Sequence, residues 1–333
     1  MIETRVQMIG TQRSGSNLLR LMLDQLPEVF APPSVHVLRD FQDLVPAYGP
    51  LTEDQSFRSL IHDVIAVINE NVLKWPVDSL SVDTVFDQCS GRTLEHVYSA
   101  VHDVAADRCA KAWVSKSLEN VERLDRMREA IPGLQVLHLL RDPRDVALSF
   151  TKAPIGPKHP VAIAWIWIEH QKLAAKHAEG AESSSWNEVR YEDLVVSPRD
   201  TVEQLCSAYN ISFSGDVTGF YQRLDAREAP ELSSLWANLD KPVQAANSGK
   251  YRLSQHREFV EAVEEAAYDS MITWGYEPLY ARGQRHYSST QINDIMDKDS
   301  ELRRKHPEQQ NPLIQAPHKR RDEILESVRR AIP

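Results

Sequence analysis

The stretch GTQRSGSN near the N-terminus could bind a phosphate group. Gly10 and Gly15 have the spacing of a phosphate-binding loop, and a loop between a strand and a helix presents backbone N–H groups to an anion. ATP-binding loops of this kind continue with Lys and then Ser or Thr, whereas this chain continues with Ser16 and Asn17. The positive charge lies inside the loop instead, on Arg13, whose guanidinium is a permanent forked donor. Taken alone, the stretch fits a phosphate site and an ordinary turn rich in small residues equally well.

A second segment, RDPRDVALS, directly follows the apolar run LQVLHLL. Pro143 suits the first position of a helix and Asp142 its N-cap. Arg141 would then lie at the end of a strand, with Ser149 about two turns along the next helix. By itself this segment is more typical of a surface helix start with balanced charges.

Strand and helix patterns alternate along the chain, which predicts a parallel sheet with right-handed crossovers. The expected strands are residues 6–9, 112–115, 134–140 and 188–191, and the expected helices are 17–26, 57–73, 93–108, 119–131, 161–177 and 198–209. Prolines predict an extended loop after the first helix. Because ligands bind at the carboxyl ends of parallel strands, both segments above lie where a ligand site is expected.

Length and charge restrict the functional classes. The 333 residues, 42% of them hydrophobic, suffice for one large α/β domain or a domain with an insertion. Residues 281–333 carry 11 Lys and Arg against 8 Asp and Glu, a net charge of +3, so a total of −10 leaves −13 on the first 280 residues. A body this acidic is a poor general binder of nucleic acid.

Targeting and cysteine patterns favour a cytoplasmic protein. The N-terminus has no signal-peptide pattern, and the longest apolar run, residues 161–168, is too short to span a bilayer. The three cysteines lack the spacing of a disulfide framework or a zinc site. In the expected last helix, about residues 322–332, apolar positions predict packing on the body or on a second subunit of a homodimer, rather than on a membrane.

Together, TQRSGSNLLR after its strand and the later LLRDPRDVALS resemble the PAPS-dependent sulfotransferase family. PAPS is 3′-phosphoadenosine 5′-phosphosulfate. The resemblance implies that the first loop binds the 5′-phosphosulfate through Arg13, Ser14, Gly15, Ser16 and Asn17. It also implies that Arg141 and Ser149 bind the 3′-phosphate.

Two further segments carry the same resemblance. VRYEDL is similar to the family segment whose tyrosine lies by the adenine, which implies Tyr191. NSGKYRLS is similar to the late basic segment that closes over the 3′-phosphate, which implies Ser248, Gly249, Lys250 and Arg252. The likeness spans about residues 6–278 and is weak over residues 38–110.

The resemblance implies an α/β fold with a central parallel sheet flanked by helices, of the P-loop-like sulfotransferase type and nearer the bacterial and tyrosylprotein branch than the cytosolic one. Residues 1–280 would form one domain, with a helical acceptor-side insertion over about 40–110. Residues 281–333 would form a charged helical extension.

The implied reaction is metal-independent, in-line transfer of a sulfuryl group from PAPS to a hydroxyl, giving 3′-phosphoadenosine 5′-phosphate (PAP) and a sulfate ester. A phosphosulfate carries less charge than ATP, so arginine and backbone donors can hold it without a metal ion. No acidic magnesium site or zinc ligand set is identified in the sequence. The acceptor is a small molecule or a carrier-bound intermediate with a hydroxyl group.

The proton acceptor is expected in APPSVHVLRD, the loop after the first helix. Some family members carry a catalytic glutamate near this point, where the chain has Ser34, so His36 is the predicted base and Asp40 the alternative. A histidine packed under a loop is the competing interpretation. Lys116 follows the strand at residues 112–115 and is predicted to contact the phosphosulfate, although an ordinary surface lysine would also fit.

Two other functions stay open at this point. A P-loop kinase would need ATP and magnesium, and the missing lysine argues against it. A protein that binds the nucleotide without turnover would need to have lost its catalytic positions, yet both His36 and Lys116 are present.

Overall fold

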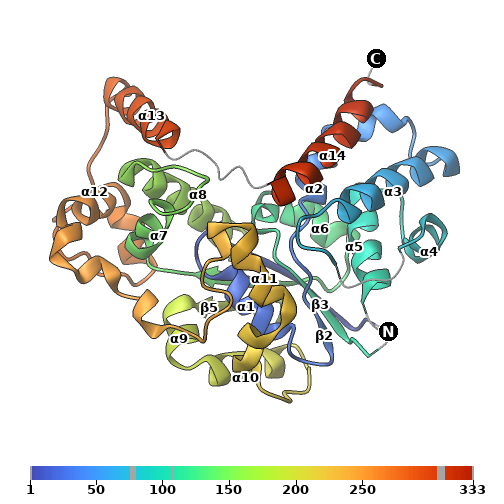
Figure 1. Ribbon diagram of the computed structural model, residues 1–333, viewed down its shortest axis with the longest axis horizontal. Coiled ribbons are helices and arrows are strands. Elements are labelled where there is room, and N and C mark those ends of the chain that lie inside the picture. The colour runs from blue at the N-terminus through green and yellow to red at the C-terminus, as the bar shows by residue number, and fades with distance from the viewer. Residues whose placement is uncertain (1, 76–79, 107–108, 306–311, 332–333) are drawn as a thin grey trace.

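The protein is built around a parallel sheet with the strand order β2-β3-β1-β4-β5. The computed structural model describes residues 2–75, 80–106, 109–305 and 312–331. Within them the strands are β1 (Thr4–Gly10), β2 (Val29–Phe30), β3 (Ala112–Ser115), β4 (Gln135–Leu140) and β5 (Trp186–Arg190). Figure 1 shows helices on both sides of this sheet, as the predicted α/β class requires.

The helices fill the connections between strands and continue beyond the last strand. In chain order they are α1 (Ser16–Leu23), α2 (Val37–Phe41), α3 (Asp54–Asn69), α4 (Val82–Gln88), α5 (Leu94–Ala105), α6 (Leu124–Ala130), α7 (Pro143–Phe150), α8 (Pro160–Ala178), α9 (Tyr191–Val196), α10 (Pro198–Ala208), α11 (Leu224–Leu232), α12 (Arg257–Thr273), α13 (Ser289–Arg304) and α14 (Pro312–Arg329). None of these helices, over the residues described, is long and apolar enough to cross a membrane.

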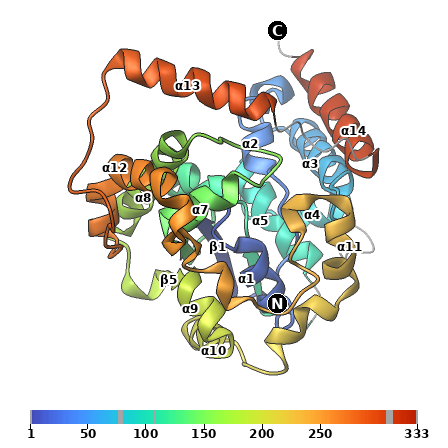
Figure 2. The same ribbon diagram turned by 60° about the vertical axis from the view of Figure 1, so that its left-hand side comes forward.

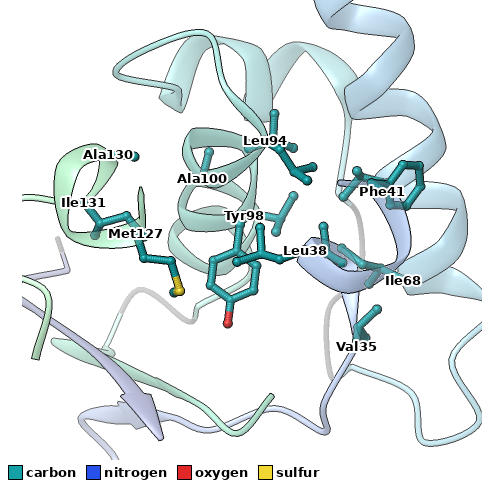
Figure 3. Close-up of a cluster of buried hydrophobic side chains, with 14 of the residues drawn as sticks. Val35, Leu38, Phe41, Ile68, Leu94, Tyr98, Ala100, Met127, Ala130 and Ile131 are labelled. Atoms are coloured by element: carbon teal, nitrogen blue, oxygen red, sulfur yellow. The ribbon is translucent and has the colours of Figure 1, made fainter. Parts of the chain in front are cut away.

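Alternate residues of the strands face opposite layers of helices. Ile9 of β1 and Trp113 of β3 pack with α2, α3, α5, α6 and α14. Met8 of β1 and Val114 of β3 pack with α1, α10 and α11 on the other face. In Figure 3, side chains of the first layer converge, and the Tyr98 hydroxyl points out of the cluster. That hydroxyl donates to Gln7 of β1 at 2.7 Å, which ties α5 to the central strand.

The register of the two central strands places the predicted motifs side by side. Gly10 at the end of β1 pairs with Leu139 of β4, so the loop after Gly10 and Arg141 start from the same edge of the sheet. The approach is close: a Cβ on Gly10 would lie 2.3 Å from the Leu139 carbonyl oxygen, and its φ of 144° also favours glycine. The expectation that both segments occupy neighbouring strand ends is confirmed.

The fold differs from the sequence prediction at short elements. The loop expected after the first helix contains β2 and α2, and α4 lies between the two predicted helices of the insertion. The predicted helix at 119–131 begins as a 3-10 turn, Leu118–Arg123, before α6. Tyr191 starts α9 instead of ending a strand. These elements have too few residues to show a hydrophobic period. The predicted helix at 93–108 ends at Ala105, and residues 107–108 lie outside those described.

The second arginine of RDPRD joins α7 to α12. Arg144 is buried and donates to both oxygens of Asp142, at 2.9 and 2.7 Å, and to Glu264 of α12 at 2.8 Å. The Glu264 carboxylate also accepts the backbone N–H groups of residues 279–281. These paired, hydrogen-bonded charges link the start of α7 to α12 and to residues 279–281.

Candidate active site

A cavity of about 520 Å³ lies at the carboxyl ends of β1 and β4. Its volume falls within the range of roughly 300–1,000 Å³ that is usual for ligand pockets. The predicted binding residues on its wall are Arg13, Gly15, Ser16, Asn17, Arg141, Ser149, Tyr191 and Lys250. Residues far apart in sequence therefore share one site.

The loop between β1 and α1 has the backbone shape of an anion cradle. Arg13 has a left-handed φ of 71°, which is uncommon for a residue with a side chain. Gly15 has a φ of 94°, and a Cβ there would lie 2.4 Å from the Tyr191 ring. Helix α1 begins without a side-chain cap. The N–H groups of its first turn are thus available to an anion.

Arginine contacts bind the separate segments together. Arg13 donates from Nε to Ser149 Oγ at 3.1 Å. Arg141 donates to the Arg13 carbonyl at 2.7 Å and to the Asn247 carbonyl at 2.7 Å. Its guanidinium also stacks over the Tyr191 ring, 4.0 Å from the centroid. The loop, α7, α9 and the segment before Lys250 consequently meet around two positive charges.

The site contains positive charges and buried donor groups that have no anionic partner among the residues described. Burial, together with the nearby charge of Arg141, lowers the pKa of Arg13 to about 10. Ser14 is buried, and its Oγ has no hydrogen-bond partner among the residues described, nor does Nε of Arg141. Buried donors without partners are rare in folded proteins. Arg141 lines the cavity and Ser14 does not, so a bound phosphate would accept from Arg141 and offset the repulsion between the two guanidinium groups.

The late basic segment is held on α7 by a carboxylate that the sequence prediction passed over. Asp145 accepts the backbone N–H of Gly249 at 2.6 Å and that of Tyr251 at 3.2 Å. This anchoring brings Lys250 to the cavity, where its ammonium donates to Asn247 Oδ1 at 2.5 Å. Ser248, Gly249 and Arg252 do not line the cavity, and the Arg252 guanidinium lies 5.0 Å from the centroid of the Tyr251 ring.

His36 contacts a second functional group that the sequence did not reveal. Its Nδ1 hydrogen-bonds to Glu119 Oε1, and both side chains are partly exposed. Although burial opposes ionisation, the hydrogen bond from His36 and its charge lower the pKa of Glu119 to about 2. An ionised Glu119 accepts the Nδ1 proton and leaves Nε2 as the ring nitrogen that can take up another.

Lys116 lies near Glu119, the partner of His36, and near Arg13 in the loop between β1 and α1. Burial, then the charge of Arg20, then to a smaller extent that of Arg13, lower the pKa of its ammonium to about 8, while Glu119 acts in the opposite direction. Neither Lys116 nor His36 lines the 520 Å³ cavity. Both residues lie on the β3 side of the loop between β1 and α1.

Asp40, the alternative base, lies close to two arginine side chains. Its Oδ1 accepts from Arg39 at 2.9 Å, and its Oδ2 lies 3.5 Å from Nε of Arg321 in α14. Asp40 Oδ2 has no hydrogen-bond partner among the residues described. His36 and Asp40 thus both remain candidates for the base.

Residues 6–215 match the family model described as "Sulfotransferase family". The chain belongs to this family. No curated protein matches the sequence. The fold is similar to that of a solved "Sulfotransferase Domain from the Curacin Biosynthetic Pathway", with a TM-score of 0.59 and 20% identity over 83% of this chain and 99% of that one. It is also similar to the sulfotransferase domain of the Synechococcus PCC 7002 olefin synthase, with a TM-score of 0.56 and 19% identity over 83% and 96%.

Part of the sulfotransferase cavity was missed by the sequence prediction. Residues 234–239 and 241–244 form one wall of it, with Phe220 nearby. Trp236 is half-buried there, and its neighbour Leu235 offers a carbonyl 3.4 Å from Arg13. The available signal was a lone tryptophan in a polar stretch, which is too weak to distinguish a ligand contact from packing.

A second cavity of the sulfotransferase, about 450 Å³, adjoins the first. Leu239 lines both. The second also includes Pro33, three residues before His36, and Arg20, whose charge acts on Lys116. Its apolar wall consists of Pro33, Val72, Leu73, Leu224, Ala229, Leu232 and Leu239. Leu239 is thus shared by the two cavities, and His36 lines neither of them.

Proposed function

We propose that this sulfotransferase transfers a sulfuryl group from PAPS to a hydroxyl group and releases PAP. The observation that carries the proposal is the meeting of two anion-binding segments in one cavity. Arg141 donates to the backbone of Arg13, and Arg13 donates to Ser149. A nucleotide with phosphate groups at both its 3′ and 5′ positions matches such a pair of sites, whereas ATP carries its charge on one side only.

Each part of the donor has a proposed set of contacts. The 5′-phosphosulfate is assigned to Arg13, Ser14, Gly15, Ser16 and Asn17, and the 3′-phosphate to Arg141, Ser149 and Lys250. The support is their place on the cavity wall and, for Ser14, a buried hydroxyl without a partner among the described residues. Tyr191 and Trp236 are assigned to the adenine because aromatic faces stack on bases. Ser248 and Arg252 remain assigned to the closing segment, and Gly249 holds it in place through Asp145.

In the proposed step the acceptor oxygen attacks sulfur as its proton passes to Nε2 of His36. A new O–S bond forms, and the bond from sulfur to the bridging phosphate oxygen breaks. Its electron pair stays on the PAP phosphate. Glu119 holds the ring by Nδ1 and stabilises the imidazolium, while Lys116 and Arg13 stabilise the charge that grows on the leaving oxygen. The positive charge comes from side chains, so the proposed step has no metal ion.

A titration with PAP and ATP tests this function. Because the cavity offers two anion sites, we expect PAP to bind without magnesium and to outcompete ATP, measured by calorimetry with and without chelator. Magnesium-dependent binding of ATP in preference to PAP would instead support a kinase. Tight PAP binding without turnover on any alcohol would support a non-catalytic nucleotide-binding protein.

The second cavity is proposed for the acceptor. Its wall is mainly apolar and it begins close to the loop of His36. We expect alcohols with an apolar body to be sulfated faster than polyols of similar size, since burial of apolar surface contributes about 25 cal/mol per Å². Product formation from labelled PAPS across a matched panel measures this order, and faster labelling of polyols would exclude this cavity as the acceptor site.

A further inference from the structure

The C-terminal extension packs on two separate parts of the molecule. Helix α13 lies against α8, with Ile295 in their shared apolar cluster. Helix α14 packs on α3 through Leu325 and Val328, and Arg320 forms an ion pair with Glu70. Figure 2 shows α13 extending along one side of the molecule toward α2. Both helices of the extension thus pack on the folded body, α13 on α8 and α14 on α3.

The carboxylate of Asp299 in α13 contacts the backbone at the start of α8. Asp299 is fully buried, and its Oδ1 accepts the backbone N–H of Lys158 at 2.6 Å and of His159 at 2.8 Å. Its Oδ2 forms an ion pair with Arg303 at 2.7 Å. Burying a carboxylate is costly unless it is paired and hydrogen-bonded. Here it satisfies two N–H groups at the start of α8, where the helix dipole favours negative charge.

The segment that Asp299 holds connects directly to the nucleotide cavity. Residues 151–159 join Ser149 of α7 to α8, and Thr151 and Lys152 at their start line the cavity. The loop is folded tightly: the ammonium of Lys158 donates to the carbonyls of Ile155 and Gly156, at 2.8 and 2.9 Å. A shift at one end of such a loop would therefore move the other.

Helix α8 also supports both phosphate-binding segments from behind. Trp167 donates from its indole to the Arg141 carbonyl at 3.0 Å. Gln171 donates to Thr11 Oγ1 at 3.2 Å, at the start of the phosphate loop. The position of α8 thus affects Arg141 and the loop together, in addition to Ser149.

We propose that Asp299 is a positioning residue for the site of the 3′-phosphate, acting through residues 151–159 and α8. This inference rests on the proposed function. It assigns the extension a part in nucleotide binding, because the first two residues of this loop line the cavity and its last residue donates to a carboxylate 140 residues further along the chain.

The test compares Asp299→Asn, which keeps the shape of the side chain but not its charge, with Asp297→Asn. Asp297 is an exposed residue of the same helix, so it controls for the change in charge. We expect Asp299→Asn to lower PAP affinity by roughly 2- to 30-fold and to leave affinity for AMP, which lacks the 3′-phosphate, much less changed. Hydrogen exchange at the Lys158 and His159 amides should accelerate, and Asp297→Asn should resemble the unchanged protein.

Each other outcome is decisive. Equal losses for PAP and AMP would indicate a merely structural role and overturn the inference. Unchanged PAP affinity in Asp299→Asn would overturn it as well, without affecting the proposed function. Failure of the unchanged protein to bind PAP would overturn both. If Asp299→Asn unfolds, Arg303→Met removes only the partner of the carboxylate. That variant must lose PAP affinity while AMP affinity changes much less, or the inference is wrong.

Discussion

Replacing His36 with alanine is expected to reduce turnover by roughly 10²–10⁴ while PAP affinity stays nearly unchanged. The physical reason is that His36 does not line the cavity proposed for the nucleotide, so its loss would remove a proton acceptor without removing a contact to PAP. Initial rates and PAP calorimetry on the same preparations provide the measurement.

Two control variants distinguish the base from its neighbours. Glu119→Gln removes the anion that holds Nδ1, so it should reduce turnover less than His36→Ala and add little to it in the double variant. Lys116→Ala should reduce turnover. In the unchanged protein turnover should decline above about pH 8, because the ammonium of Lys116 loses its proton there, and the variant should lack this decline. Near-normal turnover in His36→Ala would rule out His36 as the base.

Replacing Arg141 with alanine is expected to weaken PAP binding by roughly 10- to 150-fold, the equivalent of about 1.5–3 kcal/mol for a hydrogen bond to a charged group. The loss should be far smaller for adenosine 5′-phosphosulfate, which lacks the 3′-phosphate. Binding of both ligands to both proteins, measured by calorimetry, gives the comparison.

A second substitution separates recognition from structural support. Arg141 also donates to the carbonyls of Arg13 and Asn247, so its removal could distort the loop. Arg141→Lys keeps the positive charge but lacks the forked guanidinium. It should therefore recover part of the PAP affinity that Arg141→Ala loses. If alanine weakens both ligands equally and lysine recovers nothing, Arg141 serves the loop and does not recognise the 3′-phosphate.

The sequence by itself determined the elements that depend on local pattern. The apolar runs of β1, β3 and β4 can be identified although Gln7 interrupts the first and His138 the last, because strands buried on both faces have no regular polar alternation. The Asp-Pro pair specified the start of α7, with Asp142 as its cap, as found. Glycine spacing and Arg13 marked the loop that is proposed to bind a phosphate group. All of these signals lie within a few residues of each other.

Only the tertiary structure decided which distant groups meet. Glu119 and His36 are 83 residues apart and come together because β3 and β2 are neighbours in the sheet. Asp145 anchors Gly249 across 104 positions, and Asp299 reaches His159 across 140. Hydrophobic periodicity does not reveal such pairs, since an acidic residue with a distant partner has the same local sequence pattern as an exposed one. The chain thus encodes its strands and its phosphate loop locally, whereas the partner of the proposed base follows from strand order and helix packing.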